Sequence, residues 1–303
     1  MKKDFYKLGG ITLLLAVVIV WAGYDLFLRS ATPSFDETRF INIRPNSSLD
    51  DVGTGLVDAG ILKKKNGFVW LGKITGWGSQ IKAGHFEFGE GVSNRDILDV
   101  LRRGLQEPVR VRIPAGTRKE HLIRAMASEM AFSEEDLARA LSDDSLASDL
   151  STDTNHLWGF MIPDTYSYYW LTEPEDVIRR VKDHFDSIIA SAMDSLDAIP
   201  MNMTLEEIIR LAGIVEWESA HVPEKPRIAG GYINWLQNRW ALQADPTIQY
   251  ALMLTEGEKR RLRFKDYELD DPFNTYKYRG LPPGPITNPG QTSIQAVLFP
   301  EEH

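Results

Sequence analysis

Apolar residues are concentrated in one run near the N-terminus. Residues 8–24 contain no charged side chain, and three further apolar residues follow Asp25. As an α-helix, residues 8–24 rise about 1.5 Å per residue and reach roughly 25 Å, close to the thickness of the hydrocarbon core of a bilayer. We therefore expect a single transmembrane helix at residues 8–28, joined by a linker at residues 29–39 to the rest of the chain.

The flanks of this run indicate its orientation. Three lysines lie within residues 1–7, and the positive-inside tendency places that segment in the cytoplasm and the bulk of the chain outside it. Trp21 and Tyr24 stand where aromatic residues meet a membrane interface. The alternative is a cleaved signal peptide, whose apolar part usually spans about 7–15 residues before a small-residue cleavage site. The greater length favours a retained anchor. An exported chain without cysteine suits a bacterial envelope, so we expect the anchor in the inner (cytoplasmic) membrane and the bulk of the chain in the periplasm.

Beyond the linker, the hydrophobic pattern changes repeatedly between the strand period and the helix period. It predicts strands at 40–43, 84–88 and 109–113, and helices at 49–61, 68–74, 93–103 and 174–196. Residues 109–117 repeat the strand, proline, turn and hydroxyl residue of 40–48, which favours a second strand–turn–helix unit capped by Thr117; chance similarity is the alternative. The expected fold class is α+β: a transmembrane helix, a small β–α module and a larger α+β domain.

Composition removes several classes of function. A chain of 303 residues is long for one small core, which supports two folded parts. With 34 Lys and Arg against 43 Asp and Glu, the net charge is −9 and no extended basic face is apparent, so no nucleic-acid partner is expected. The absence of cysteine excludes disulfides, thiolate nucleophiles and Cys-ligated metals.

Two glutamates at a predicted helix end are the first candidates for chemistry. Thr204 and Glu207 form a capping-box pattern, so a helix begins there and runs to Glu216-Trp-Glu218, before Pro223. A carboxyl group where a helix leaves the core is open to desolvation, which raises its pKa. The two glutamates lie at opposite edges of the apolar face of this helix. Spacing alone does not choose between them, nor between a functional and a merely solvated pair.

The remaining motif searches are negative. Glu218 and His221 spell half of a di-iron ligand set, but the other histidines supply no second copy. The sequence has no H-E-x-x-H, G-x-S-x-G, Walker A or G-x-G-x-x-G pattern. We expect neither a metal nor a cofactor.

Three further segments combine amides, carboxylates and aromatic rings, as a sugar-binding groove would. The last of them contains the Pro- and Gly-rich residues 280–290, which cannot form a helix or a central strand. Turn chemistry or a polyproline ligand for another domain are the alternatives. The polar and aromatic residues that stand out are Asp164, Tyr166, Asn234, Gln243, Asp245, Asn274, Tyr276 and Asn288.

Together these segments resemble the endolytic murein transglycosylases, the MltG or YceG-like family. Four motifs in the family's order carry the resemblance, and it extends over nearly the whole chain. They are Gly159-Phe-Met-Ile-Pro-Asp-Thr-Tyr166, Ala212-Gly-Ile-Val-Glu-Trp-Glu218, Leu242-Gln-Ala-Asp-Pro-Thr247, and Asn274-Thr-Tyr276 with Gly280-Leu-Pro-Pro-Gly-Pro-Ile286.

The resemblance implies an organisation and an activity. It implies a LysM-like module at 40–106 and a YceG-like catalytic domain at 107–303, with a C-terminus that we expect to be shorter than the family's. The implied enzyme is a lyase, a peptidoglycan lytic transglycosylase that cleaves the MurNAc–GlcNAc β-1,4 bond within glycan strands and leaves 1,6-anhydro-MurNAc ends. A role in ending the elongation of nascent strands, beside peptidoglycan synthases at the inner membrane, is also implied.

The resemblance also assigns residues. Glu218 matches the family's catalytic glutamate, acting as general acid and then as base. Asp164, Tyr166, Asn234, Gln243, Asp245, Asn274, Tyr276 and Asn288 match positions that line or support the glycan groove. Two positions depart from the family pattern: Trp158 stands where a glutamate is usual, and Trp235 where an arginine is common.

Two rival hypotheses remain open. The first is an envelope glycoside hydrolase, which would need a second carboxylate besides Glu218, supplied by Asp245 or Asp164. The second is a membrane-anchored peptidoglycan-binding scaffold without turnover.

Overall fold

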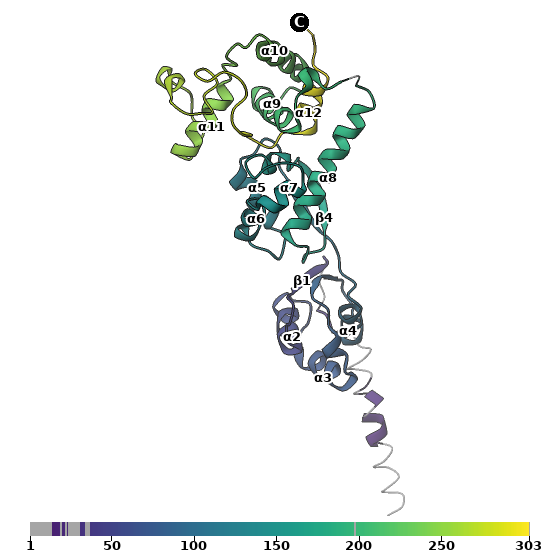
Figure 1. Ribbon diagram of the computed structural model, residues 1–303. Helices are drawn as coiled ribbons and strands as arrows, with labels where there is room; N and C mark the ends of the chain where they lie inside the picture. The colour runs from purple at the N-terminus through teal and green to yellow at the C-terminus, as the bar shows by residue number, and fades with distance from the viewer. Residues whose placement is uncertain are drawn as a thin grey trace, which may run out of the picture. The chain divides into compact units, whose positions relative to one another are not determined.

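The computed structural model describes residues 14–18, 20–21, 23, 31–33, 37–196 and 198–302. The chain separates into two compact units, Met1–Val109 with Tyr169–Leu171, and Arg110–Tyr168 with Thr172–His303 (Figure 1). We expected a boundary after residue 106, and the division falls after Val109. The return of Tyr169–Leu171 to the first unit has no signal in the sequence.

The first unit contains a two-stranded antiparallel sheet covered by helices. β1 (Arg39–Ile43) pairs with β2 (Gly84–Phe88), and Ile41 lies opposite Phe86. Alternate strand residues are buried against the helices, and this alternation is the pattern that predicted both strands. The helical elements of this unit are α2 (Leu49–Asp58), α3 (Lys65–Thr75), η1 (Trp77–Gln80) and α4 (Asn94–Arg103).

The second unit is mainly helical. Its sheet has two strands, β3 (Val109–Ile113) and β4 (Asp164–Tyr168), of which the second was not predicted. The early helical elements are α5 (Lys119–Ala127), α6 (Glu134–Ala140), α7 (Asp144–Asp149), η2 (Leu157–Phe160) and α8 (Pro174–Met193). The later ones are η3 (Pro200–Asn202), α9 (Leu205–Glu218), η4 (Val222–Glu224), α10 (Lys225–Gln237), α11 (Asp245–Glu256), η5 (Phe264–Glu268) and α12 (Gln291–Leu298).

Helix α9 is the core of the second unit. Every residue from Leu211 to Val215 is buried, and α10, α11 and α12 all pack against α9. Such burial around the whole circumference is expected of a helix surrounded by others rather than lying on a surface. The end of α9 is therefore held rigidly by several elements, which suits a position that must place a reactive group.

The internal repeat is real in local structure, but its register differs by one residue from the predicted one. β1 ends at Ile43 and β3 at Ile113, and the third residue after each has a left-handed backbone, with φ of 64° at Asn46 and 63° at Gly116. The N-cap is Ser48 in the first copy and Arg118 in the second. The prediction that Thr117 caps this helix is wrong. Thr117 lies one residue before the N-cap, and its N–H donates to Asn288 Oδ1.

The fold class is α+β, as expected. The transmembrane helix that we predicted at residues 8–28 falls largely outside the described residues, of which 14–18, 20–21 and 23 are helical. Within the described ranges, no helix is both long enough and apolar enough to cross a membrane. Residues 280–290 form neither helix nor strand, which confirms that prediction.

Candidate functional site

The candidate site begins at the C-terminal end of α9. The predicted capping box is present: Thr204 Oγ1 accepts from Glu207 N at 3.3 Å, and Thr204 N donates to Glu207 Oε2 at 3.0 Å. The helix ends at Glu218 because Ser219 is extended, with φ −144° and ψ 132°. Each residue of the Glu216-Trp217-Glu218 motif then meets a different partner.

Glu216 turns into the protein. Its Oε2 accepts hydrogen bonds from Lys225 Nζ at 3.0 Å, Gly290 N at 3.1 Å and Ser293 Oγ at 2.5 Å. The side chains of Glu216 and Lys225 are only 13% and 4% exposed. This buried pair joins α9, α10 and the start of α12, so Glu216 is placed to hold the fold rather than to meet a substrate.

Trp217 and Asn288 fix the turn between β3 and α5. Trp217 Nε1 donates to Gly116 O at 2.9 Å. Asn288 is fully buried, donates from Nδ2 to Pro114 O and Met161 O at 2.9 Å each, and accepts from Thr117 N at 2.9 Å. Asn288 therefore supports the region behind the end of α9 and does not line a groove.

Glu218 differs from the other described carboxyl groups with perturbed pKa values, because its surroundings raise its pKa rather than lower it. Tyr232, a buried residue of α10, donates its hydroxyl to Glu218 Oε1 in a very short hydrogen bond. Desolvation by the surrounding protein raises the pKa of Glu218, the nearby negative charge of Asp245 raises it further, and the Tyr232 hydrogen bond partly opposes both. The residue as a whole is exposed, so this carboxyl group combines a raised pKa with access for a substrate.

Asp245 is the second carboxylate of the site. It is the first residue of α11, where the positive end of the helix dipole favours a negative charge. Tyr276 donates its hydroxyl to Asp245 Oδ1 at 2.7 Å, and the Tyr267 hydroxyl also bonds to this carboxylate. The rings of Tyr267 and Tyr276 meet edge to face, with centroids 4.7 Å apart. Asp245 is thus held by two tyrosine hydroxyls close to Glu218.

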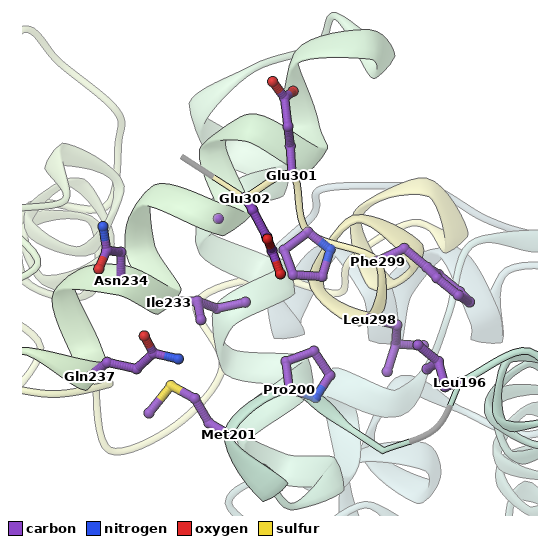
Figure 2. Close-up of a pocket in the computed structure, with 12 residues that line it drawn as sticks. Leu196, Pro200, Met201, Ile233, Asn234, Gln237, Leu298, Phe299, Glu301 and Glu302 are labelled. Atoms are coloured by element: carbon purple, nitrogen blue, oxygen red, sulfur yellow. The ribbon is translucent and has the colours of Figure 1, made fainter.

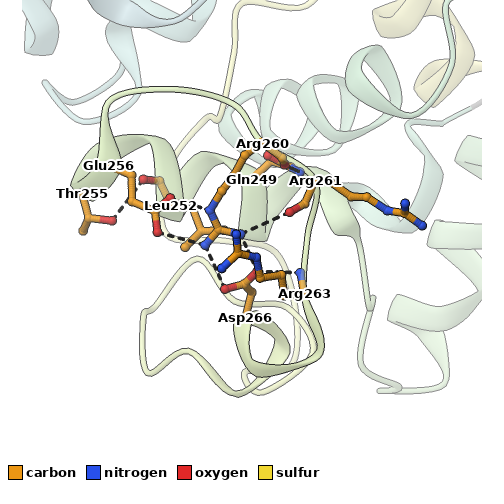
Figure 3. Close-up of polar contacts among 8 residues, drawn as sticks. All are labelled: Gln249, Leu252, Thr255, Glu256, Arg260, Arg261, Arg263 and Asp266. Atoms are coloured by element: carbon orange, nitrogen blue, oxygen red, sulfur yellow. Dashed lines mark hydrogen bonds and ion pairs between the residues drawn. The ribbon is translucent and has the colours of Figure 1, made fainter.

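Hydrogen bonds and an ion pair stabilise the loop that carries Tyr267 and Tyr276. Asn274 is fully buried, and its Nδ2 donates to Tyr267 O and Leu269 O at 3.0 and 2.8 Å. Figure 3 shows the second brace, in which Arg260 bonds both oxygens of Asp266 at 2.7 and 3.0 Å and both oxygens of Glu256. The Arg260 guanidinium holds the pKa of Asp266 well below its usual range. Asp266 directly precedes Tyr267, so this cluster fixes the loop where it reaches Asp245.

The structure brings together only part of the predicted residue set. Glu218, Asp245 and Tyr276 belong to one cluster, and Asn274 supports it. Gln243 is exposed next to the cluster, with a left-handed backbone (φ 49°), and its N–H donates to Thr275 O at 3.2 Å.

Asp164 and Tyr166 belong to another cluster. Asp164 Oδ2 lies 3.9 Å from His184 Nδ1, and the Tyr166 hydroxyl lies 3.0 Å from the same nitrogen. Tyr166 also donates to Ile162 O at 3.2 Å. Their partner is a residue of α8, so the described contacts place this pair apart from the Glu218 cluster.

Asn234 is an exposed residue of α10. Together with Ile233 and Gln237, it lines a hollow of about 610 Å³ between α10 and the segment after α12 (Figure 2). Tyr232, two positions earlier on α10, is the residue that reaches Glu218. Positions two apart on a helix point in different directions, so Asn234 and Tyr232 cannot both face the same carboxyl group.

Sequence reasoning missed Tyr232 and Tyr267. Tyr232 stands in the same Tyr-Ile-Asn segment as Asn234, so a signal for this segment existed in the sequence. Tyr267 has no local signal. Of the two unusual tryptophans, Trp158 is buried, and Trp235 packs edge-on against Tyr232 with centroids 5.4 Å apart.

The fold and site define an α+β protein whose candidate site combines two carboxyl groups. One, at a helix end, has a raised pKa and accepts the Tyr232 hydroxyl, and the other is held by Tyr267 and Tyr276. The sequence profile of the YceG-like family matches residues 41–303. The chain belongs to this family.

Known relatives agree with this assignment. The endolytic murein transglycosylase of Bacillus subtilis is 27% identical over 278 residues, which cover 86% of this chain and 76% of that protein. The protein of the same name from Streptococcus pneumoniae D39 is 26% identical over 91% of this chain, which spans 55% of its length. The crystal structure of a yceG-like protein from Listeria monocytogenes matches with a TM-score of 0.59 and 27% identity, over 89% of this chain and 92% of that one.

Proposed function

We propose that the chain is an endolytic peptidoglycan lytic transglycosylase, which cleaves the MurNAc–GlcNAc β-1,4 bond within glycan strands and leaves 1,6-anhydro-MurNAc ends. The observation that carries this proposal is the Glu218 carboxyl group, which stands at the end of α9, accepts the Tyr232 hydroxyl and has a raised pKa. Membership of the YceG-like family and relatives named endolytic murein transglycosylase supply the reaction class.

The proposed mechanism needs one carboxyl group in two protonation states. Protonated Glu218 donates its proton to the glycosidic oxygen as the bond from that oxygen to C1 of MurNAc breaks. The resulting carboxylate then accepts the proton of the C6 hydroxyl, whose oxygen forms the new bond to C1. No water is consumed, and Glu218 ends protonated. A raised pKa of Glu218 favours the first step, because more of the acid form is present near neutrality.

Asp245 has a supporting role in this mechanism. An ionised carboxylate close to Glu218 favours the protonated form of Glu218 and stabilises positive charge that develops at C1. The same position supports the second candidate function, a glycoside hydrolase in which Asp245 activates a water molecule. Asp164 is a poor candidate for that role, since its described contact is with His184.

The two reactions differ in their products. After digestion of purified glycan strands, we expect mass spectrometry to find fragments with anhydro ends. Reducing ends, heavier by one water molecule, would assign the chain to the hydrolases. An Asp245→Asn variant separates the roles further: a hydrolase loses its base, whereas the transglycosylase keeps a reduced activity with the same anhydro product.

Two substitutions are expected to move the pH profile in opposite directions. The rate constant kcat/KM should fall as pH rises through the pKa of Glu218, because the acid form is lost. Asp245→Asn removes a negative charge that raises the pKa of Glu218, so the fall in kcat/KM should occur at lower pH. Tyr232→Phe removes a hydrogen bond that favours the Glu218 carboxylate, so the fall in kcat/KM should occur at higher pH.

Tyr232→Phe should also lower kcat by roughly ten- to a hundredfold, because the Glu218 carboxyl group is no longer oriented. The pH dependence of glycan cleavage by both variants and the parent provides the measurement. Tyr278→Phe is a matched control, because the Tyr278 hydroxyl bonds Asp270 on an exposed part of the loop. Shifts of the same sign in both test variants would contradict the roles given to Tyr232 and Asp245.

We also propose that residues 8–28 anchor the chain in the inner membrane, with residues 1–7 in the cytoplasm. The absence of charge from 8–24 and the lysines before it support this. Among the described residues of the run, Leu14, Leu15, Val17, Val18, Val20 and Trp21 are all more than half exposed, so an apolar solvent would suit them. An anchored enzyme would meet glycan strands as they leave the synthases, where a cut within the strand ends elongation.

A further inference from the structure

One helix face of the first unit is both apolar and positively charged. On α3, Trp70 and Ile74 are each 52% exposed, and the exposed Lys73 stands at the same helical spacing. The opposite side of the helix carries Phe68 and Leu71, which are fully buried in the core of the unit. Within the described part of the chain, no element covers the outer side of α3.

Two more exposed lysines stand immediately before the helix. Lys64 is the N-cap of α3 and Lys63 precedes it, and both side chains are exposed. Unlike Lys65, which pairs with Asp50 at 2.7 Å, neither they nor Lys73 form an ion pair with any described residue. We call Lys63, Lys64, Trp70, Lys73 and Ile74 the α3 face.

The charge of the α3 face is local. Residues 31–109 contain ten basic and ten acidic residues, so this part of the chain is neutral, whereas residues 110–303 contain 20 basic and 31 acidic residues. Attraction to an anionic surface must therefore come from the lysine cluster and not from the chain as a whole. The pairing of Trp with Lys side chains is typical of protein surfaces that meet lipid headgroups.

The chain enters the first unit directly beside this face. Ala31 N donates to Val92 O at 2.9 Å, and Lys63 N donates to Ala31 O at 3.4 Å. Gly91 N donates to the buried Thr32 hydroxyl at 2.9 Å, which fixes the same entry point. From Gly23 to Ala31 the chain has eight steps and spans at most about 28 Å. An anchor in the preceding run therefore keeps Lys63 near the membrane.

We propose that the α3 face docks on the surface of an anionic phospholipid bilayer. Trp70 and Ile74 enter the headgroup region, while Lys63, Lys64 and Lys73 face the lipid phosphates. The proposal goes beyond the glycan chemistry and rests on the proposed anchor, which supplies the proximity. Docking would restrict the rotation of the first unit about its tether, so that it stays at the membrane surface.

The absence of cysteine allows a direct test. The full chain is reconstituted in vesicles of phosphatidylglycerol and phosphatidylcholine, with one spin label at Trp70→Cys, Ile74→Cys or, as a control, Leu105→Cys. Leu105 is a matched site, being apolar and 47% exposed. In anionic vesicles we expect the labels at 70 and 74 to be reached by oxygen more than by a water-soluble nickel complex, and the label at 105 to show the reverse.

Charge reversal tests the lysines. In the Ile74→Cys background, Lys63→Glu, Lys64→Glu and Lys73→Glu should each reduce the ratio of docked to undocked label at least about fivefold, the effect of one lysine near an anionic surface. Lys82→Glu changes another exposed lysine of the same unit and should leave the ratio unchanged. Vesicles of phosphatidylcholine alone should give the undocked signal.

Each contrary result has a clear meaning. Labels at 70 and 74 that are as accessible to nickel as the label at 105 would overturn the proposal. Protection by glycan strands without lipid would make the α3 face a glycan surface, and broadening between labels would make it a contact between copies. A chain that does not float with the vesicles would reject the anchor and docking together, while retained glycan cleavage by the charge-reversed variants would leave the enzymatic proposal intact.

Discussion

Glu218→Gln should abolish measurable glycan cleavage while leaving the protein folded. A positioned general acid contributes on the order of 10²–10⁴ to a rate, and in the proposed mechanism Glu218 serves as acid and then as base, so we expect a loss at the upper end of this range. Stability should change little, since the described hydrogen-bond partner of the Glu218 carboxyl group is Tyr232, and the amide can still accept that bond. Release of anhydro fragments from purified strands, followed by mass spectrometry, measures the loss.

The controls for this variant separate catalysis from binding. Glu224→Gln changes an exposed glutamate on the turn that follows α9 and should cleave like the parent. Sedimentation with purified glycan should show that Glu218→Gln still binds. If Glu218→Gln cleaves at the parental rate, Glu218 has no part in the mechanism. If the parent itself binds glycan but never cleaves it, the non-catalytic scaffold is the correct interpretation.

Lys225→Met should destabilise the second unit by about 3–5 kcal/mol, because it leaves the buried Glu216 carboxylate without its cation. Lys225 Nζ also donates to Ser293 Oγ at 2.9 Å and Thr292 Oγ1 at 3.3 Å, so the loss reaches the start of α12 as well. Urea unfolding at neutral pH, followed by tryptophan fluorescence, measures the free energy of unfolding.

A double variant distinguishes a lost interaction from a simple packing defect. Glu216→Gln with Lys225→Met removes both charges and should recover much of the stability lost in Lys225→Met. In the refolded double variant Glu218 is unaltered, so cleavage should return with the fold. A Lys225→Met protein as stable as the parent would show that the pair does not hold α9, α10 and α12 together.

Glu218→Gln and Lys225→Met test separately the roles of two glutamates, Glu216 and Glu218, that spacing alone does not distinguish. Both stand at the end of the same helix, two positions apart, with similar neighbours. Burial of Glu216 against Lys225 and Ser293, and the opening of Glu218 toward Tyr232 and Asp245, depend on α10, α11 and α12. The family resemblance pointed to Glu218, and the packing of these helices against α9 gives the physical reason: one glutamate is held inside the fold and the other is left in the candidate site.

The same limit applies to the residues chosen around Glu218. Asp245 and Tyr276 were predicted, and they lie in contact because residues 267–278 return to the start of α11. Tyr267 takes part for the same reason, although nothing in its own segment marks it. Asp164 and Tyr166 stand in an equally polar segment, but β4 directs them to His184. Local composition indicated which segments are unusual and could not indicate which of them meet.

Local patterns by themselves determined most of the secondary structure. Alternation placed β1, β2 and β3, and the capping box at Thr204 placed the start of α9, because these signals act over a few residues. The motifs of the second unit were sufficient to reveal the family. Tertiary structure decided the rest: the capping of α5 by Arg118, the pairing of Tyr232 with Glu218, and the burial of Asn288 and Glu216. Each of these depends on contacts between residues far apart in the chain, and the environment of a carboxyl group, which sets its pKa, exists only when those contacts form.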